Sequence, residues 1–138
     1  MKKYYLVAVI LFFAVACGTT KTAGFDKTTS KSDTIRIAND ELEYEVIIID
    51  AGFNTWLATY GKPRNFNSQH YMEQRNQTWV MQWNQNVMTG KRRDLFEMTI
   101  NYDSNTDYGY EVNYLLYNYL TYVQLTNNIQ LGGFSARL

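Results

Sequence analysis

The apolar residues between Val112 and Val123 recur with the strongest helical period in the chain, and this repeat constrains the fold most. They fall at positions i, i+3, i+4, i+7, i+8 and i+11, which are Val112, Leu115, Leu116, Tyr119, Leu120 and Val123. This spacing places all of them on one face of an α-helix. Because that face is wide and apolar, other elements of the same domain must cover it.

Two further helices are predicted upstream of this repeat. One spans 53–60, where four apolar residues share helical spacing, and a longer one runs from about 68 to 88. The candidate caps are Asp50 and Gly61 for the first helix, and Asn67 or Ser68 with Gly90 for the second. Small polar residues before a helix and glycine after it are the usual boundary signals.

Alternating apolar and polar residues predict strands over 42–49 and 96–102. Two strands do not form a stable sheet alone, so helices must pack on them. We therefore expect an α+β domain with about three helices on a small two- to three-stranded sheet. After Asn128 the pattern predicts an irregular tail, in which Leu131, Phe134 and Leu138 are expected to dock on the core.

Composition excludes several classes of protein. The 138 residues are 46% hydrophobic and 16% aromatic, which is far too apolar for wholesale disorder. The formal net charge is zero, which provides no field to attract nucleic acid. A single cysteine excludes an intramolecular disulfide and a cysteine-rich zinc cluster.

That cysteine, Cys17, follows a leader. Met1-Lys2-Lys3 is basic, and the apolar run from Leu6 to Ala16 would span only about 16 Å as a helix, against a hydrocarbon core of roughly 30 Å. The run therefore suits a signal peptide better than a membrane span. Residues 14–18 (AVACG) resemble the lipobox of bacterial lipoproteins, except that Ala14 replaces the usual leucine. We expect residues 1–16 to be removed and Cys17 to carry acyl chains, palmitate among them.

Residues 17–33 are expected to form a flexible tether, because they are rich in Thr, Ser, Gly and Lys. The single α+β domain is then predicted over 34–138. Asp33-Thr34-Ile35 resembles the tripeptide that Bacteroidota glycosylate, which makes Thr34 a possible glycosylation site. The alternative is that these residues begin a strand.

The chain also resembles an uncharacterised family of small Bacteroidota lipoproteins, known as a domain of unknown function. The resemblance is carried by residues 37–40, 45–50, 52–57, 108–119 and 130–134, the fourth of which reads YGYEVNYLLYNY. It implies an envelope location in a bacterium with an outer membrane. It implies no activity, cofactor or catalytic residue.

Residue patterns give weak support to catalysis or metal binding. His70 is the only histidine, so a nucleophile–base pair would have to use it, and a surface position is the simpler interpretation. Asp103, Asn105 and Asp107 alternate as calcium ligands do, but the glycine and glutamate positions of that loop do not match. A polar turn that caps a helix explains the same residues. We expect no catalytic residue, no metal site and no cofactor.

The last candidate is a surface on the final helix. Tyrosine rings and asparagine amides suit contacts with sugars or proteins. The candidate residues are Tyr110, Asn113, Tyr114, Tyr117 and Asn118. The alternative is a helix buried on most sides. We expect a lipid-anchored, non-catalytic interaction or structural module whose partners are the membrane and an envelope protein, with a glycan- or peptidoglycan-binding lipoprotein as the alternative. We expect it at the outer membrane of a Gram-negative bacterium, on the periplasmic side.

Overall fold

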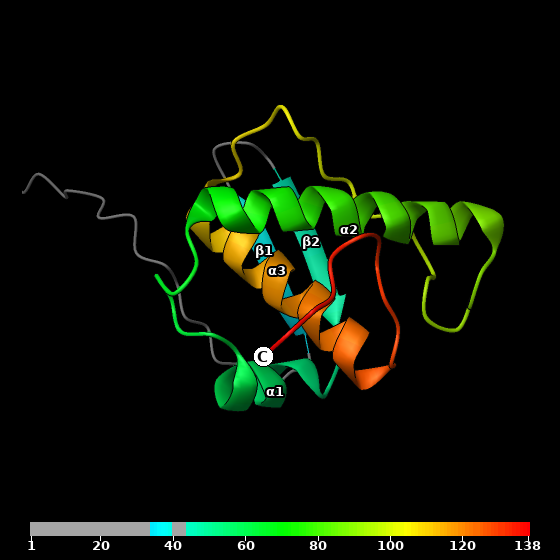
Figure 1. Cartoon of the computed structure of the whole chain (residues 1–138), viewed down its shortest axis with the longest axis horizontal. Coiled ribbons are helices and arrows are strands. Elements are labelled where there is room, and N and C mark those ends of the chain that lie inside the picture. Colours follow the sequence, from blue (N-terminus) through cyan, green and yellow to red (C-terminus); the bar gives the residue numbers. More distant parts are fainter. Residues whose placement is uncertain (1–33, 40–43) are drawn as a thin grey trace, which may run out of the picture. The chain divides into compact units, whose positions relative to one another are not determined.

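The computed structural model describes residues 34–39 and 44–138 (Figure 1). Within these ranges the order of elements is β1 (Thr34–Asn39), β2 (Tyr44–Ile49), α1 (Phe53–Tyr60), α2 (Gln69–Thr89) and α3 (Gly109–Thr126). Helix α3 contacts α1, α2 and β1, so it is the element around which the others pack. An α+β architecture with three helices in the described part agrees with the prediction. The leader, Cys17 and the tether lie outside the described residues.

The two strands form an antiparallel pair in the described part of the chain. Ile37 pairs with Val46, and Asn39 pairs with Tyr44. Residues that alternate along a strand share one face, and the buried ones here are Ile37, Tyr44 and Ile48. The predicted strand over 42–49 is thus observed as β2 over 44–49, but its partner is β1 rather than 96–102.

The helix boundaries follow the capping signals in the sequence. The Asp50 carboxylate accepts hydrogen bonds from the backbone N–H groups of Gly52 (2.8 Å) and Phe53 (3.3 Å) at the start of α1. The Ser68 hydroxyl accepts one from the Tyr71 N–H (3.2 Å) at the start of α2. Gly90 ends α2 in the left-handed conformation, with φ 68°. The predicted helices are therefore confirmed.

The predicted strand over 96–102 is wrong, because the segment is irregular. Two side chains of α2 satisfy its backbone instead of a neighbouring strand. The Asn84 amide accepts from the Ile100 N–H and donates to the Ile100 carbonyl, both at 2.8 Å, and the Trp83 indole donates to the Met98 carbonyl at 2.9 Å. Phe96 and Ile100 are buried, whereas Met98 is 73% exposed, so the apolar residues do not share one strand face.

The core lies on both sides of α3. The apolar repeat over 112–123 is buried as predicted, with Leu116 and Leu120 fully inaccessible and Tyr119 half-buried. Leu131 from the C-terminal tail is also fully buried, which confirms its predicted docking. Phe134 and Leu138 stay 40% and 58% exposed. No helix in the described ranges has the length and apolarity required to cross a bilayer.

Candidate functional site

The predicted tyrosine–asparagine surface of α3 is not an exposed surface. Asn113, Tyr114, Tyr117 and Asn118 are each at most 6% exposed, and Tyr110 alone is half-buried. The reason is geometric: α2, α1 and β1 surround α3, so its polar faces are covered as well as its apolar one. Their polar groups bond within the domain, as in the hydrogen bond from the Tyr114 hydroxyl to the Lys62 carbonyl (2.8 Å). The alternative, a helix buried on most sides, is the observed one.

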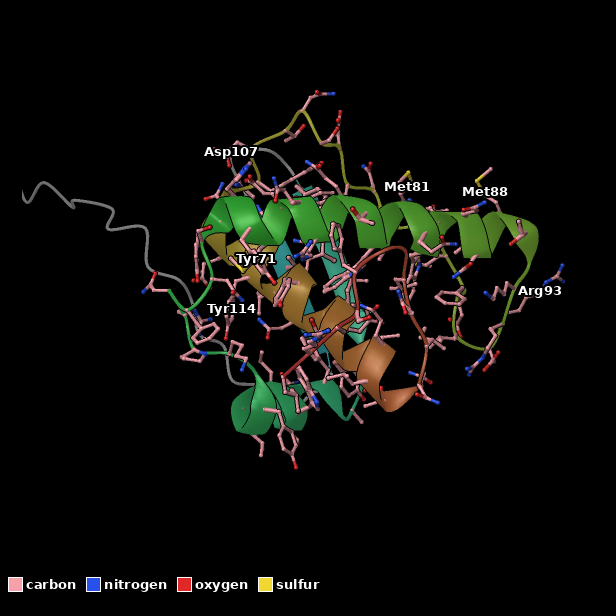
Figure 2. All side chains as sticks on the ribbon, viewed as in Figure 1. Tyr71, Met81, Met88, Arg93, Asp107 and Tyr114 are labelled. Carbon is pink, nitrogen blue, oxygen red and sulfur yellow. The ribbon has the colours of Figure 1, made fainter. Side chains whose placement is uncertain are left out.

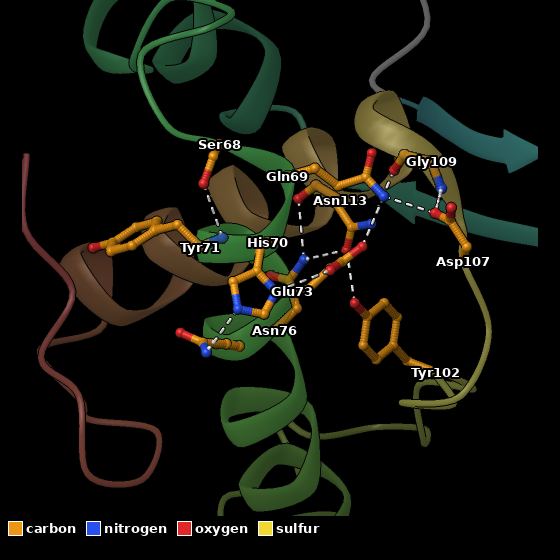
Figure 3. Close-up of polar contacts among 11 residues, drawn as sticks. Ser68, Gln69, His70, Tyr71, Glu73, Asn76, Tyr102, Asp107, Gly109 and Asn113 are labelled. Atoms are coloured by element: carbon orange, nitrogen blue, oxygen red, sulfur yellow. Dashed lines mark hydrogen bonds and ion pairs between the residues drawn. The ribbon is translucent and has the colours of Figure 1, made fainter.

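Asn113 is the centre of a buried polar cluster between α2 and α3 (Figure 3). Its side-chain oxygen accepts hydrogen bonds from Asn76 (3.1 Å) and from the Tyr102 hydroxyl (2.7 Å). Its amide nitrogen donates to the Gly109 carbonyl at 2.9 Å. Buried amides need such partners, so Asn113 acts as a structural connection between the two helices and the 95–108 segment.

His70 lies at the surface, and the acidic turn accepts hydrogen bonds from its own backbone. The His70 side chain is 79% exposed and lies 3.8 Å from the Glu73 carboxylate. Asp103 accepts from the Asn105 N–H (2.9 Å), and Asp107 accepts from the Gly109 N–H (2.9 Å) at the start of α3. The described residues contain no group of three or more His, Cys, Asp or Glu side chains that could hold a metal ion.

A small polar cavity lies beside this turn, with a volume of about 320 Å³. Its two carboxylates, Glu73 and Asp107, each accept a hydrogen bond of 2.7 Å from the same Gln69 amide (Figure 3). One amide nitrogen thus bridges the two carboxylates. The cavity is built from hydrogen bonds that hold the start of α2 to the start of α3.

A larger cavity, of about 500 Å³, lies between the first half of α2 and the C-terminal tail. We call it the Arg75 cavity. Its lining combines aromatic rings with cations, and it consists of Lys62, Phe66, Asn67, Tyr71, Arg75, Trp79, Tyr117, Gly133, Phe134, Ser135, Arg137 and Leu138. This volume falls within the range of roughly 300–1,000 Å³ that small-molecule sites occupy. No Asp, Glu, His or Cys is among these lining residues.

Stacked rings form the inner wall of the Arg75 cavity. Trp79 and Tyr117 are stacked with centroids 5.4 Å apart, and both are buried. The Trp79 indole N–H donates to the Phe134 carbonyl at 3.0 Å, which ties the C-terminal tail to α2. Burial, and then the neighbouring Tyr71 phenol, raises the pKa of Tyr117 to about 12, so this phenol stays neutral at ordinary pH.

Arg75 supplies the half-buried cation of this site. Its guanidinium carbon lies 3.6 Å from the Phe134 ring centroid and 4.9 Å from that of Tyr71. Within the described ranges, Arg75 has neither an ion pair nor a hydrogen bond to a side chain or backbone acceptor. The positive charge of Arg75 is therefore stabilised by cation–π contacts with the two rings and is not neutralised by a carboxylate side chain.

Of the five residues predicted as a binding surface on the final helix, only Tyr117 lines this cavity. One signal was present, because Tyr71, Arg75 and Trp79 follow each other at four-residue intervals and so share one face of α2. The other half of the cavity comes from the tail, and no local pattern connects the two segments.

Comparison with known proteins assigns a family but no activity. Residues 4–137 match the model of a family of unknown function, DUF6146. Neither a curated protein nor a solved structure matches the chain. Since the family match spans most of the sequence, this chain belongs to the DUF6146 family, a family of unknown function.

Proposed function

We propose that this protein is a lipid-anchored cell-envelope protein whose domain binds a partner without catalysing a reaction. The observation that carries the binding half of the proposal is the Arg75 cavity. It is of ligand size, its walls are rings and cations, and its lining residues have no carboxylate side chain, imidazole or thiol. General acid–base catalysis most often uses an imidazole or a carboxylate, whereas binding requires only surface and charge.

The anchoring half rests on the amino-terminal sequence. The basic start, the short apolar run and Cys17 follow in the order that lipoprotein processing requires. Acyl chains on Cys17 hold the protein to the membrane, and residues 18–33 connect the anchor to the domain. The resemblance to Bacteroidota lipoproteins supports the outer membrane as the location. The lack of an acidic run after Gly18 supports its periplasmic side.

The anchor is tested with Cys17→Ser. The wild-type protein should incorporate labelled palmitate and fractionate with membranes, whereas the variant should do neither. A wild-type protein that is unlabelled and recovered in the soluble fraction would contradict the anchor. The binding role is tested by chemical crosslinking in the native envelope followed by mass spectrometry. A protein partner should be recovered, and retention on purified peptidoglycan without any protein partner would contradict this choice.

A second candidate function, glycan binding, is favoured by the exposed rings around the Arg75 cavity. Phe66, Tyr71 and Phe134 are 63%, 38% and 40% exposed, and aromatic rings of this kind pack against sugar faces. This candidate uses different residues from the tyrosine–asparagine surface expected on α3. Retention on purified peptidoglycan that is lost on Phe66→Ala would support it.

We also propose that Thr34, the first residue of β1, carries a glycan. The aspartate, hydroxyl residue and aliphatic residue at 33–35 support this modification. The intact mass of the native mature protein should exceed that of the Thr34→Val variant by more than the mass difference between threonine and valine. Equal masses after correction for the substitution would exclude the modification.

A further inference from the structure

Arg75 has hydrogen-bonding capacity that the described part of the protein does not use. A guanidinium is planar, with its N–H donors at the edge and its faces available for stacking. The guanidinium carbon lies over the rings of Phe134 and Tyr71, at 3.6 and 4.9 Å from their centroids. None of its N–H donors meets a hydrogen-bond acceptor in the described ranges. The ring contacts also restrict the side chain, which lowers the entropy lost when a ligand binds.

The surroundings of Arg75 add positive charge. Lys62 and Arg137 line the same cavity, and no Asp or Glu side chain is among its lining residues. The Lys62 ammonium lies 5.0 Å from the Phe66 ring centroid at the rim. The nearby Arg64 differs, because it is paired with Glu111 at 2.9 Å and does not line the cavity. The cavity thus presents cations whose charge is not balanced by its own side chains.

We propose that the Arg75 cavity binds a small ligand that carries a carboxylate on a ring. The carboxylate meets the edge of Arg75, where a planar fork of donors matches its two oxygens. The ring lies against the exposed faces of Phe66, Tyr71 and Phe134. This inference rests on the proposed binding function and names its ligand class. The ring can be that of an acidic sugar or an aromatic acid, and the experiment distinguishes the two.

The experiment is calorimetric titration of the full chain in nonionic detergent with two matched pairs of probes. N-acetylmuramic acid is paired with N-acetylglucosamine, which lacks its lactyl carboxylate, and phenylacetate is paired with phenylacetamide. At least one acid should bind with a Kd of about 1 mM or tighter. It should bind at least about tenfold more tightly than its neutral partner, the effect of one charged hydrogen-bonded pair. Whichever acid binds identifies the ring.

Nuclear magnetic resonance on the wild-type chain locates the binding. The Trp79 indole N–H bonds to the Phe134 carbonyl in the cavity, whereas the Trp83 indole bonds to the Met98 carbonyl elsewhere. The bound acid should shift the Trp79 indole signal and leave that of Trp83 unchanged. Since this readout needs no substitution, it holds even if variants of Arg75 do not fold.

Substitution then tests the role of Arg75 itself. Arg75→Gln should weaken binding of the acid at least about tenfold and leave the neutral partner unaffected. Arg93→Gln is the matched control, because Arg93 follows α2 at the end opposite Tyr71 (Figure 2). The proposal is overturned if no acid binds at millimolar concentration, or if acids and neutral partners bind equally. It is also overturned if a folded Arg75→Gln binds as the wild type does. A partner crosslinked in the envelope without any acid binding would retain the proposed function and reject this inference.

Discussion

Replacement of Asn84 by alanine should destabilise the domain by about 2 kcal/mol. The Asn84 amide makes two hydrogen bonds of 2.8 Å to the backbone of Ile100, one to its N–H and one to its carbonyl. Each hydrogen bond contributes about 1 kcal/mol net to stability. Ile100 is only 8% exposed, so water does not readily replace the lost partners of its N–H and carbonyl groups. For a domain of about 100 residues, this corresponds to a fall in Tm of roughly 8–16 °C.

The assay is urea unfolding of Asn84→Ala, with hydrogen exchange measured at the Ile100 amide. Gln85→Ala is the matched control, since Gln85 is its exposed neighbour on α2 and should change stability by less than about 0.5 kcal/mol. The Ile100 amide should lose protection beyond the global change seen at Leu116 in α3. Equal stability of the two variants, with the Ile100 amide still protected, would refute the claim that Asn84 holds this segment in place of a strand.

Three further predictions concern the core, a helix end and alkaline pH. Leu116→Ala should cost about 2–5 kcal/mol by denaturant unfolding, because Leu116 is fully buried, whereas Leu125→Ala on the same helix, 39% exposed, should cost under about 1 kcal/mol. Gly90→Ala should cost about 1 kcal/mol, because φ is 68° and an added Cβ would meet the Arg93 side chain at 2.9 Å. A Cβ at Gly133 would meet nothing within 4 Å, so Gly133→Ala should be nearly neutral. Burial, and then the Asp50 carboxylate, raises the pKa of Tyr119 to about 12. The folded state therefore holds a proton that the unfolded chain releases near pH 10, so the contribution of Tyr119 to stability is constant below pH 10 and should fall between about pH 10 and 12. Urea midpoints with tyrosinate absorbance measure this, and a midpoint unchanged up to pH 12 would contradict it.

The helices could be predicted from the sequence because their signals are local. Ser68 and Gly90 bracket α2 by interactions within one turn of its ends, and the helical period of 112–123 needs only side chains on the same element. Similarly, alternation within 44–49 predicts a strand whatever its partner is. The prediction failed at 96–102, where Phe96 and Ile100 are both buried without lying in a strand. Hydrogen bonds from two side chains of α2, Trp83 and Asn84, take the place of the expected strand-to-strand hydrogen bonds. A period-two pattern carries no information about side-chain-to-backbone hydrogen bonds of this kind.

The Arg75 cavity could not be predicted for a related reason. The Trp79 indole and the Phe134 carbonyl meet across 55 residues of sequence. Arg75 gains its second aromatic neighbour, Phe134, only when the tail packs on α2, and the same tail buries Leu131 in the core. The amphipathic character of the α3 tyrosines favours a binding surface when only the sequence is considered. Burial by three neighbouring elements made them part of the core instead.

The claim that the Arg75 cavity is the binding site of an anchored protein is tested most directly by photo-crosslinking in the native envelope. A photoreactive residue is placed in the lipidated full chain at Phe66, which lines the cavity, or at Met88, which is 82% exposed on α2 (Figure 2). We predict adducts from position 66 and none from position 88, with the adducts from 66 lost on Arg75→Gln. Adducts from position 88 alone, or equal adducts from both positions, would contradict the account.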